Sequence, residues 1–150
     1  MKHKIPVSVL VVVHTVDLKV LLLERADRPG FWQSVTGSQD PGETLARTAQ
    51  RELEEETGIA VDPAQLINWN QQNRYEIYSH WRDRYAPGVT HNTEHVFGLT
   101  LPVVQDVVLA PREHLASLWL PWREAADRVF SWSNAEAIRE LPQRVAEAGQ

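Results

Sequence analysis

The segment 45–57 limits the fold more than any other part of the sequence. Thr44 precedes it as a suitable N-terminal cap, and Gly58 follows it at the position where helices often end in a left-handed turn. At about 100° per residue, one sector of such a helix is apolar and holds Leu45, Ala46, Ala49 and Leu53. Glu54 falls on the far side. The segment therefore predicts an amphipathic helix that packs its apolar stripe on a core.

Three carboxylates lie together beside that stripe, at Glu52, Glu55 and Glu56. Their spacing of i, i+3 and i+4 places them in one sector, and only Arg51 borders them. Residues 40–56 hold six acidic and two basic groups, so most of the net charge of −5 is local. Such a cluster repels itself unless a cation neutralises it, and hard oxygen donors suit Mg²⁺ or Mn²⁺. A solvated, glutamate-rich helix surface is the alternative interpretation of these residues alone.

Strands outnumber helices in the rest of the chain. The segment 7–13 is β-branched and almost wholly apolar, as in a strand that is buried on both faces. Further strands are expected at 20–23, 32–38, 66–69, 75–81, 95–101, 106–109 and 118–120, and a final helix at 135–148 that Ser133 or Asn134 would cap. Because helices interrupt the strands, the pattern predicts the α/β class with a mixed sheet covered on both faces.

Size and composition exclude several classes of protein. A length of 150 residues favours a single domain over residues 1–150. No apolar run approaches the ~20 residues of a membrane helix, and the negative charge argues against a nucleic-acid partner. The absence of cysteine fits a reducing compartment, and no cleavage site follows the apolar N-terminal segment. We therefore expect a cytoplasmic protein without a membrane or nucleic-acid partner; its oligomeric state is not predicted.

The spacing around the acidic helix matches a longer motif, GX5EX7REUXEEXGU, in which U is an aliphatic residue. It is filled in full by Gly37, Glu43, 51–53, 55–56 and 58–59. This motif is the Nudix box, and the chain resembles a Nudix hydrolase. The resemblance implies an α/β/α sandwich with a mixed β-sheet and a loop–helix–loop box. It also implies hydrolysis of a pyrophosphate bond in a small-molecule substrate.

The resemblance assigns roles to the acidic residues. Glu52 and Glu56 match the usual metal ligands, and Glu55 matches a further ligand or a base, so Glu55 and Glu56 are the expected catalytic residues. Glu113 matches a third acidic ligand from a loop opposite the helix, although an isolated glutamate is more often simply exposed. Because a polyphosphate repels carboxylates, a divalent cation such as Mg²⁺, with Mn²⁺ as a substitute, has to lie between them.

Strings outside the box resemble one subgroup of the family, whose members act on the pterin compound dihydroneopterin triphosphate. They are 31–38, 84–90, 92–94, 113–115 and 131–134. The positions that match substrate contacts are Lys4, Arg25, Thr36, Tyr75, Glu76, Ile77, Tyr78 and Ser131. Surface charges at strand ends, core aromatics and a helix-capping serine are the alternative interpretations of these residues.

The segment 75–78 poses a geometric problem for this assignment. On a strand, Tyr75 and Ile77 share one face while Glu76 and Tyr78 share the other. The four side chains are therefore not expected to line one pocket together. Among them, Glu76 is expected to accept hydrogen bonds from a ring's NH groups.

Two alternative functions stay open at this point. A hydrolase of the nucleotide pool would use the same chemistry, because a (d)NTP also joins a flat heterocycle to a triphosphate. A Nudix-fold binding module without turnover belongs to a different class of protein. It ranks lower because such modules typically lose box carboxylates, and Glu52, Glu55 and Glu56 are all present.

Overall fold

The computed structural model of the chain describes residues 3–148. Its elements are, in chain order, β1 (Val7–Thr15), β2 (Lys19–Arg25), β3 (Trp32–Gln33), β4 (Val35–Ser38), α1 (Leu45–Thr57), η1 (Pro63–Gln65), β5 (Ile67–Glu76), η2 (Ser79–Arg84), β6 (His91–Leu101), β7 (His114–Pro121), α2 (Trp122–Arg128), α3 (Trp132–Arg139) and α4 (Leu141–Ala148), where η marks a 3₁₀ helix. None of the helices within this range is both long and apolar enough to cross a membrane.

The strands form one mixed sheet in the order β3-β2-β1-β6-β5, while β4 also pairs with β1 and β7 with β2. The central pair β1 and β6 is parallel and runs in register from Val7 beside Thr93 to Thr15 beside Leu101. All the other pairings are antiparallel. The predicted mixed sheet of the α/β class is therefore confirmed.

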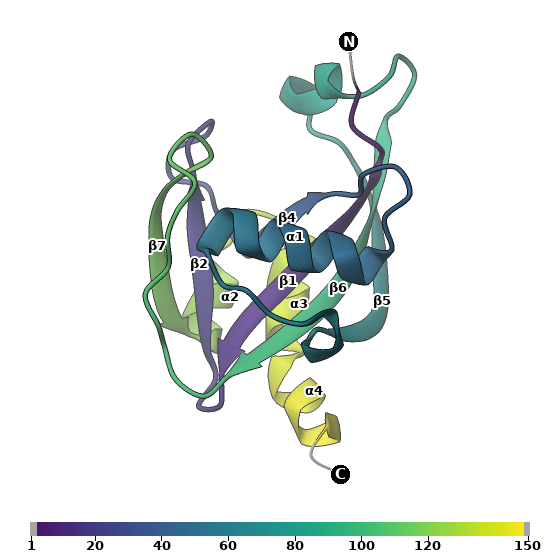
Figure 1. Cartoon of the computed structure of the whole chain (residues 1–150). Helices are drawn as coiled ribbons and strands as arrows, with labels where there is room; N and C mark the ends of the chain where they lie inside the picture. Colours follow the sequence, from purple (N-terminus) through teal and green to yellow (C-terminus); the bar gives the residue numbers. More distant parts are fainter. Residues whose placement is uncertain (1–2, 149–150) are drawn as a thin grey trace.

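Helices cover both faces of this sheet (Figure 1). On one face, Val9, Val11 and Val13 of β1 pack with Ala49 and Leu53 of α1. On the other face, alternate residues of the same strand pack against α2, α3 and α4; these are Leu10 and Val12. Because both faces are covered, β1 is buried along almost its whole length, and the expected α/β/α sandwich is the observed arrangement.

Helix α1 has the bounds that the sequence predicts. The Thr44 side chain accepts a hydrogen bond from the Arg47 N–H at 3.1 Å, and Gly58 ends the helix in the left-handed conformation at a φ of 75°. Leu53 is fully buried and Glu54 is exposed, so the predicted rotation of the helix is also correct.

An opening in the sheet arises because β1 has two different neighbours on one side. Along its first half, from Ser8 to Val11, β1 pairs with β4, but it meets β2 only where His14 lies beside Val20. Strand β2 therefore diverges from β1; it pairs with β3 at its far end and with β7 along its whole length. The space between β4 and the β2–β3 pair opens at one end of the sheet.

Two predicted strands of the central region are different in the structure. Residues 67–69 and 75–76 of these segments belong to one strand, β5, whose pairing with β6 is irregular between Asn68 and Gln72. Asn70 adopts a φ of 54° there, which interrupts the alternation of side chains. Strand β5 ends at Glu76, and η2 replaces the second half of the predicted strand.

The C-terminal third also corrects the prediction. The segment 106–109 is not a strand, because the Val108 N–H donates to the Thr57 carbonyl at the end of α1 instead of to a strand. Helix α2 was missed, and the predicted helix 135–148 is divided into α3 and α4. Pro142 explains the division, since it lacks an N–H and suits only the first turn of a new helix.

The predicted cap of the final helix is wrong as well. Ser131 caps α3 by accepting a hydrogen bond from the Asn134 N–H at 3.2 Å. Asn134 instead joins α3 to the sheet: its side chain accepts from the Ser34 N–H at 2.8 Å and donates to the Ser34 hydroxyl at 2.9 Å. This buried contact fixes the start of α3 beside the opening in the sheet.

Candidate functional site

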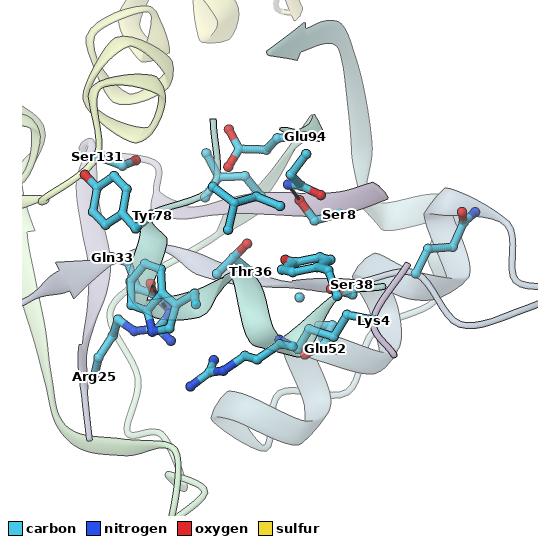
Figure 2. A pocket seen from close by; sticks show the side chains of 18 of the residues that line it. Lys4, Ser8, Arg25, Gln33, Thr36, Ser38, Glu52, Tyr78, Glu94 and Ser131 are labelled. Carbon is cyan, nitrogen blue, oxygen red and sulfur yellow. Dashed lines mark hydrogen bonds between the residues drawn. The ribbon is translucent and has the colours of Figure 1, made fainter. Parts of the chain in front are cut away.

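A cavity of about 840 Å³ fills the opening in the sheet (Figure 2). Strands β1, β4, β5 and β6, helix α1, the start of α3 and the loops before β1 and β7 all contribute to its lining. Every predicted site residue lines it: Lys4, Arg25, Thr36, Glu52, Glu55, Glu56, Tyr75, Glu76, Ile77, Tyr78, Glu113 and Ser131. The fold therefore brings together residues that are far apart in the sequence.

Glu56 is the most unusual side chain in this cavity. It is 2% exposed, and neither of its carboxylate oxygens has a hydrogen-bond partner. Burial, together with the neighbouring carboxylates of Glu52 and Glu113, raises the pKa of Glu56 well above its usual value. A buried carboxylate without a partner is costly, so this one needs a cation or a proton.

Arg51 organises the loop before the helix and one of the carboxylates. Its guanidinium donates two hydrogen bonds to the Glu43 carboxylate, at 2.7 and 2.9 Å, and one to the Ser38 carbonyl at 3.0 Å. It also contacts Glu52 at 2.8 Å and Glu55 at 3.4 Å. Arg51 and Glu43 thus hold the loop–helix–loop together, and Glu43, Glu52 and Glu55 share a single cation.

Gly37 gives Glu52 the space that it occupies. A Cβ atom at position 37 would lie 2.0 Å from the Glu52 Cδ, which is far inside van der Waals contact. Gly37 is therefore a place of close approach between its backbone and the Glu52 side chain. Strand β4 and helix α1 meet here, and any side chain larger than hydrogen at position 37 would displace the Glu52 carboxylate.

The donor set suits a divalent cation. Within residues 3–148, no three acidic or histidine side chains are already close enough together to form a ready-made metal site. Glu52 and Glu56 lie together, whereas Glu55 is 53% exposed and Glu113 is exposed on a loop that hydrogen-bonds to the Ala26 N–H at 2.9 Å. The unpartnered oxygens of Glu56 are hard donors of the kind that Mg²⁺ prefers.

A group of cations lies beside these carboxylates and is called here the cationic rim: Lys4, Arg25 and Arg84. Partial burial and the charges of Arg84 and Arg25 lower the pKa of Lys4. Arg25 donates to both carboxylate oxygens of Asp27, at 2.8 and 2.9 Å, and Arg84 donates to the same residue at 2.9 Å. One shared carboxylate leaves the rim with an excess of positive charge.

Trp81 supports the rim from one side. The Arg25 guanidinium lies over its ring at 4.3 Å, and its indole N–H donates to Asp27 at 3.1 Å. Its ring is also parallel to that of Tyr78, with centroids 5.4 Å apart. The rim and the aromatic side chains of η2 therefore form one wall of the cavity.

The structure agrees with the expectation that the four side chains of 75–78 do not all enter one pocket, although all four residues border the cavity. Tyr75, Glu76, Ile77 and Tyr78 all line the cavity, because β5 ends at Glu76 and the strand alternation ends with it. Glu76 nevertheless points outward, since its side chain is 67% exposed and its carboxylate is ion-paired with Arg82 at 2.8 Å. The Glu76 carboxylate is therefore paired with Arg82 at the surface and does not enter the cavity.

Thr36 and Ser131 use their hydroxyl groups within the protein. The Thr36 hydroxyl donates to the Val9 carbonyl at 2.8 Å, and Ser131 caps α3. Both keep lone pairs that face the cavity lining. The capping interpretation of Ser131 is thus correct, and it is compatible with a contact to substrate.

Sequence reasoning missed two buried residues of this cavity. His114 lies with its Nε2 3.5 Å from a Glu56 oxygen, and burial lowers its pKa to about 4, so the imidazole is neutral near pH 7. Glu94 of β6 is 4% exposed and lies across the cavity from Glu52 (Figure 2). The available signal for Glu94 was a carboxylate immediately before the predicted strand 95–101.

Comparisons with known proteins agree with this geometry. A NUDIX domain model matches residues 4–141. The chain is 50% identical over 142 residues to dihydroneopterin triphosphate diphosphatase of Escherichia coli K12, with 93% of each chain covered. It is 41% identical over 143 residues to the enzyme of the same name from Haemophilus influenzae, covering 93% of this chain and 89% of that one.

Solved structures give the same result. The structure of the E. coli dihydroneopterin triphosphate pyrophosphohydrolase superposes with a TM-score of 0.87 at 48% identity, covering 93% of this chain and 97% of that chain. A Nudix hydrolase structure from Listeria monocytogenes, described as putative, superposes with a TM-score of 0.78 at 21% identity, covering 96% and 97%, and supports the fold alone.

Proposed function

The chain belongs to the Nudix hydrolase family, and on that premise we propose that it hydrolyses dihydroneopterin triphosphate to the monophosphate and pyrophosphate. The observation that carries the proposal is the identity of 41–50% over most of the chain to enzymes named for this reaction. In the reaction, a water oxygen forms a new bond to phosphorus and one bridging P–O bond breaks. Pyrophosphate leaves, and the proton of the water is taken up by a base.

Nudix hydrolases generally use divalent metal ions, and Mg²⁺ is the ion that we propose here, with Mn²⁺ as a substitute. Glu52 and Glu56 would hold it, and Glu55 and Glu113 would complete the acidic set. When bound, such an ion neutralises phosphate charge and assists the attack of water on phosphorus. This assignment is supported by the two unpartnered oxygens of Glu56 and by the local excess of carboxylates.

The protein's own groups have separate tasks in this scheme. Lys4 and Arg25 would bind and orient the triphosphate, because cations beside the acidic set offset the repulsion between carboxylates and phosphates. Glu55 is a carboxylate accessible to water, at 53% exposure, and would accept the proton. Thr36, Tyr75, Ile77, Tyr78 and Ser131 would contact the linker and the ring from the cavity walls.

A substrate panel tests the proposal. Dihydroneopterin triphosphate and dATP are offered together with Mg²⁺ in ¹⁸O-labelled water, and phosphorus NMR identifies the products. We expect the pterin compound to have the higher kcat/KM, pyrophosphate as the leaving product, and no turnover in the presence of a chelator. The Glu56→Gln variant, purified in parallel, controls for contaminating hydrolases.

The alternative functions give different results in the same experiment. A ratio of kcat/KM at or below one would contradict the pterin substrate and favour a hydrolase of the nucleotide pool. Binding without turnover of any triphosphate would favour a non-catalytic module. A cytoplasmic location, with a small-molecule substrate and without nucleic acid or membrane as a partner, is part of the proposal and can be tested by cell fractionation.

A further inference from the structure

Glu94 is a buried carboxylate that the proposed chemistry does not use. It lies on β6, is 4% exposed and lines the cavity. It takes no part in the acidic set of α1 or in the salt bridges of Arg51. Its chemistry therefore needs an explanation of its own.

Strand register places Glu94 on the other side of the sheet from the acidic set. Ser8 of β1 lies beside Glu94 in the parallel pair, and residues two apart on a strand share a face. Glu94 thus shares the face of Leu10 and Val96, which pack against α3. Glu52 is on the opposite face, next to Gly37. The cavity is lined by residues of both faces, Leu10 and Glu94 on one and Gly37 and Glu52 on the other.

The surroundings of Glu94 are polar but neutral. Asn73 approaches its carboxylate at 3.5 Å, and Ser133 is the other group that stabilises its charge. Close by, the Asn92 side chain donates to the Ser8 hydroxyl at 2.8 Å and to the Tyr75 hydroxyl at 3.0 Å, while its carbonyl oxygen is buried without a partner. This end of the cavity is built from hydrogen-bonding groups without cations, which is unsuited to phosphate.

Burial raises the pKa of Glu94, because the hydrogen bonds from Ser133 and Asn73 do not replace the water that the carboxylate has lost. A ligand with N–H donors would supply the missing hydrogen bonds. In a pterin, a ring N–H and an exocyclic amino group lie side by side, and two such donors match the two oxygens of one carboxylate.

We propose that Glu94 binds the N–H donor edge of the substrate's heterocycle and determines the preference for a pterin over adenine. This inference rests on the proposed function. It replaces the prediction that Glu76 serves this purpose, since Glu76 is 67% exposed and paired with Arg82. Glu94 is then a specificity-determining residue, and the triphosphate lies toward the cationic rim.

The test compares Glu94→Gln with the wild type and with the matched control Glu136→Gln, an exposed glutamate of α3 outside the cavity. The amide keeps the shape of the side chain but turns one of its two acceptors into a donor. We expect the ratio of kcat/KM for dihydroneopterin triphosphate over dATP to fall at least about tenfold, since a mispaired buried donor is costly. The kcat/KM of the variant for dATP should stay within about threefold of the wild-type value, a difference below ~0.7 kcal/mol. This remaining turnover shows that the variant is folded.

A second measurement separates the ring from the phosphates. Dihydroneopterin without phosphates should inhibit dATP hydrolysis competitively, and Glu94→Gln should weaken that inhibition at least about tenfold. If Glu94→Gln does not fold, Glu94→Asp decides: it keeps the charge but withdraws the carboxylate by one methylene, and an unchanged substrate ratio would overturn the inference.

The outcomes distinguish the inference from its premise. A wild type that does not prefer the pterin compound contradicts the proposed function and, with it, the inference. A wild-type preference that survives intact in Glu94→Gln overturns the inference alone. A loss of preference with dATP turnover preserved supports both.

Discussion

Glu56→Gln should have opposite effects on activity and on stability. The carboxylate is 2% exposed, has no hydrogen-bond partner and lies beside Glu52 and the neutral His114. If it serves a cation, its removal should lower kcat at least ~10²-fold, equivalent to ~2.7 kcal/mol, because a charged ligand of the reaction centre is lost. Without metal, the same change removes a buried like charge and should stabilise the fold.

The size of the stability effect follows from burial. The carboxylate and the amide both bury two polar atoms at this position, but only the carboxylate also buries a charge. An unpaired buried polar group costs ~1–3 kcal/mol, and a charged one more. We therefore expect the metal-free variant to be more stable by at least ~1 kcal/mol, which raises the Tm of a chain of this size by ~2–4 °C.

The dependence of stability on pH is an independent test of whether Glu56→Gln stabilises the metal-free protein. Burial and the Glu52 carboxylate raise the pKa of Glu56 in the folded state. The stability from protonated Glu56 is therefore fully present below the unfolded pKa of about 4.3 and is lost as pH rises toward the folded pKa. Without metal, the difference in Tm between Glu56→Gln and the wild type should grow as pH rises from about 5 to about 8.

Thermal unfolding in a chelator, repeated with Mg²⁺, measures both effects. Mg²⁺ should raise the Tm of the wild type more than that of Glu56→Gln, since ligand binding stabilises only the form that binds it. Glu54→Gln, on the exposed far side of α1, is the matched control and should change neither Tm nor kcat appreciably. A Glu56→Gln variant that keeps kcat within about threefold, or that is less stable than the wild type without metal, would refute the reasoning.

Two further predictions concern the loop before α1. Gly37→Ala should raise the Mg²⁺ concentration needed for half-maximal activity at least about tenfold, with little change in Tm. The reason is that the new Cβ, 2.0 Å from the Glu52 Cδ, displaces the Glu52 carboxylate and not the backbone. Titration of activity with Mg²⁺ measures this requirement, and an unchanged requirement would contradict the prediction. Glu43→Gln should destabilise the fold by about 2 kcal/mol at neutral pH, or ~4–8 °C in Tm. Arg51 lowers the pKa of Glu43 to about 2, so the stability that it provides is present above its unfolded pKa and is lost as pH falls toward about 2, and the wild type and Glu43→Gln should converge in acid.

Local signals explain why the sequence predicted α1 so closely. Thr44, Gly58 and the apolar stripe act within a few residues of each other, and the structure reproduces their bounds and their faces. The resemblance to the family, and not any spacing, predicted most of the side chains that surround the cavity; the box itself predicted the acidic residues of α1, because its spacing constrains the helix and β4 together. These parts of the fold depend on contacts close in the sequence.

Other parts depend on contacts that no local pattern contains. The segment 75–81 has the composition of a strand, but β5 loses its partner after Glu76, where β6 begins at His91. The segment 106–109 is apolar, yet it packs beside the end of α1. Glu94 was missed for the same reason: a single acidic residue in a strand that mixes polar and apolar residues acquires meaning only when strand register places it on the cavity.

The charges of the cavity also fix the direction in which a substrate enters. Carboxylates occupy both ends, at Glu52 and Glu94, so acidity alone would not orient a ligand. The cations distinguish the two ends. Arg84 and Arg25 lie near Lys4, and the carboxylates of Glu52 and Glu113 also act on the Lys4 ammonium group, so the cations are at the Glu52 end. Glu94 has only neutral neighbours acting on its charge. A triphosphate therefore gains Coulomb energy at one end alone, and the uncharged ring is left to the end whose carboxylate has only the neutral donors Asn73 and Ser133.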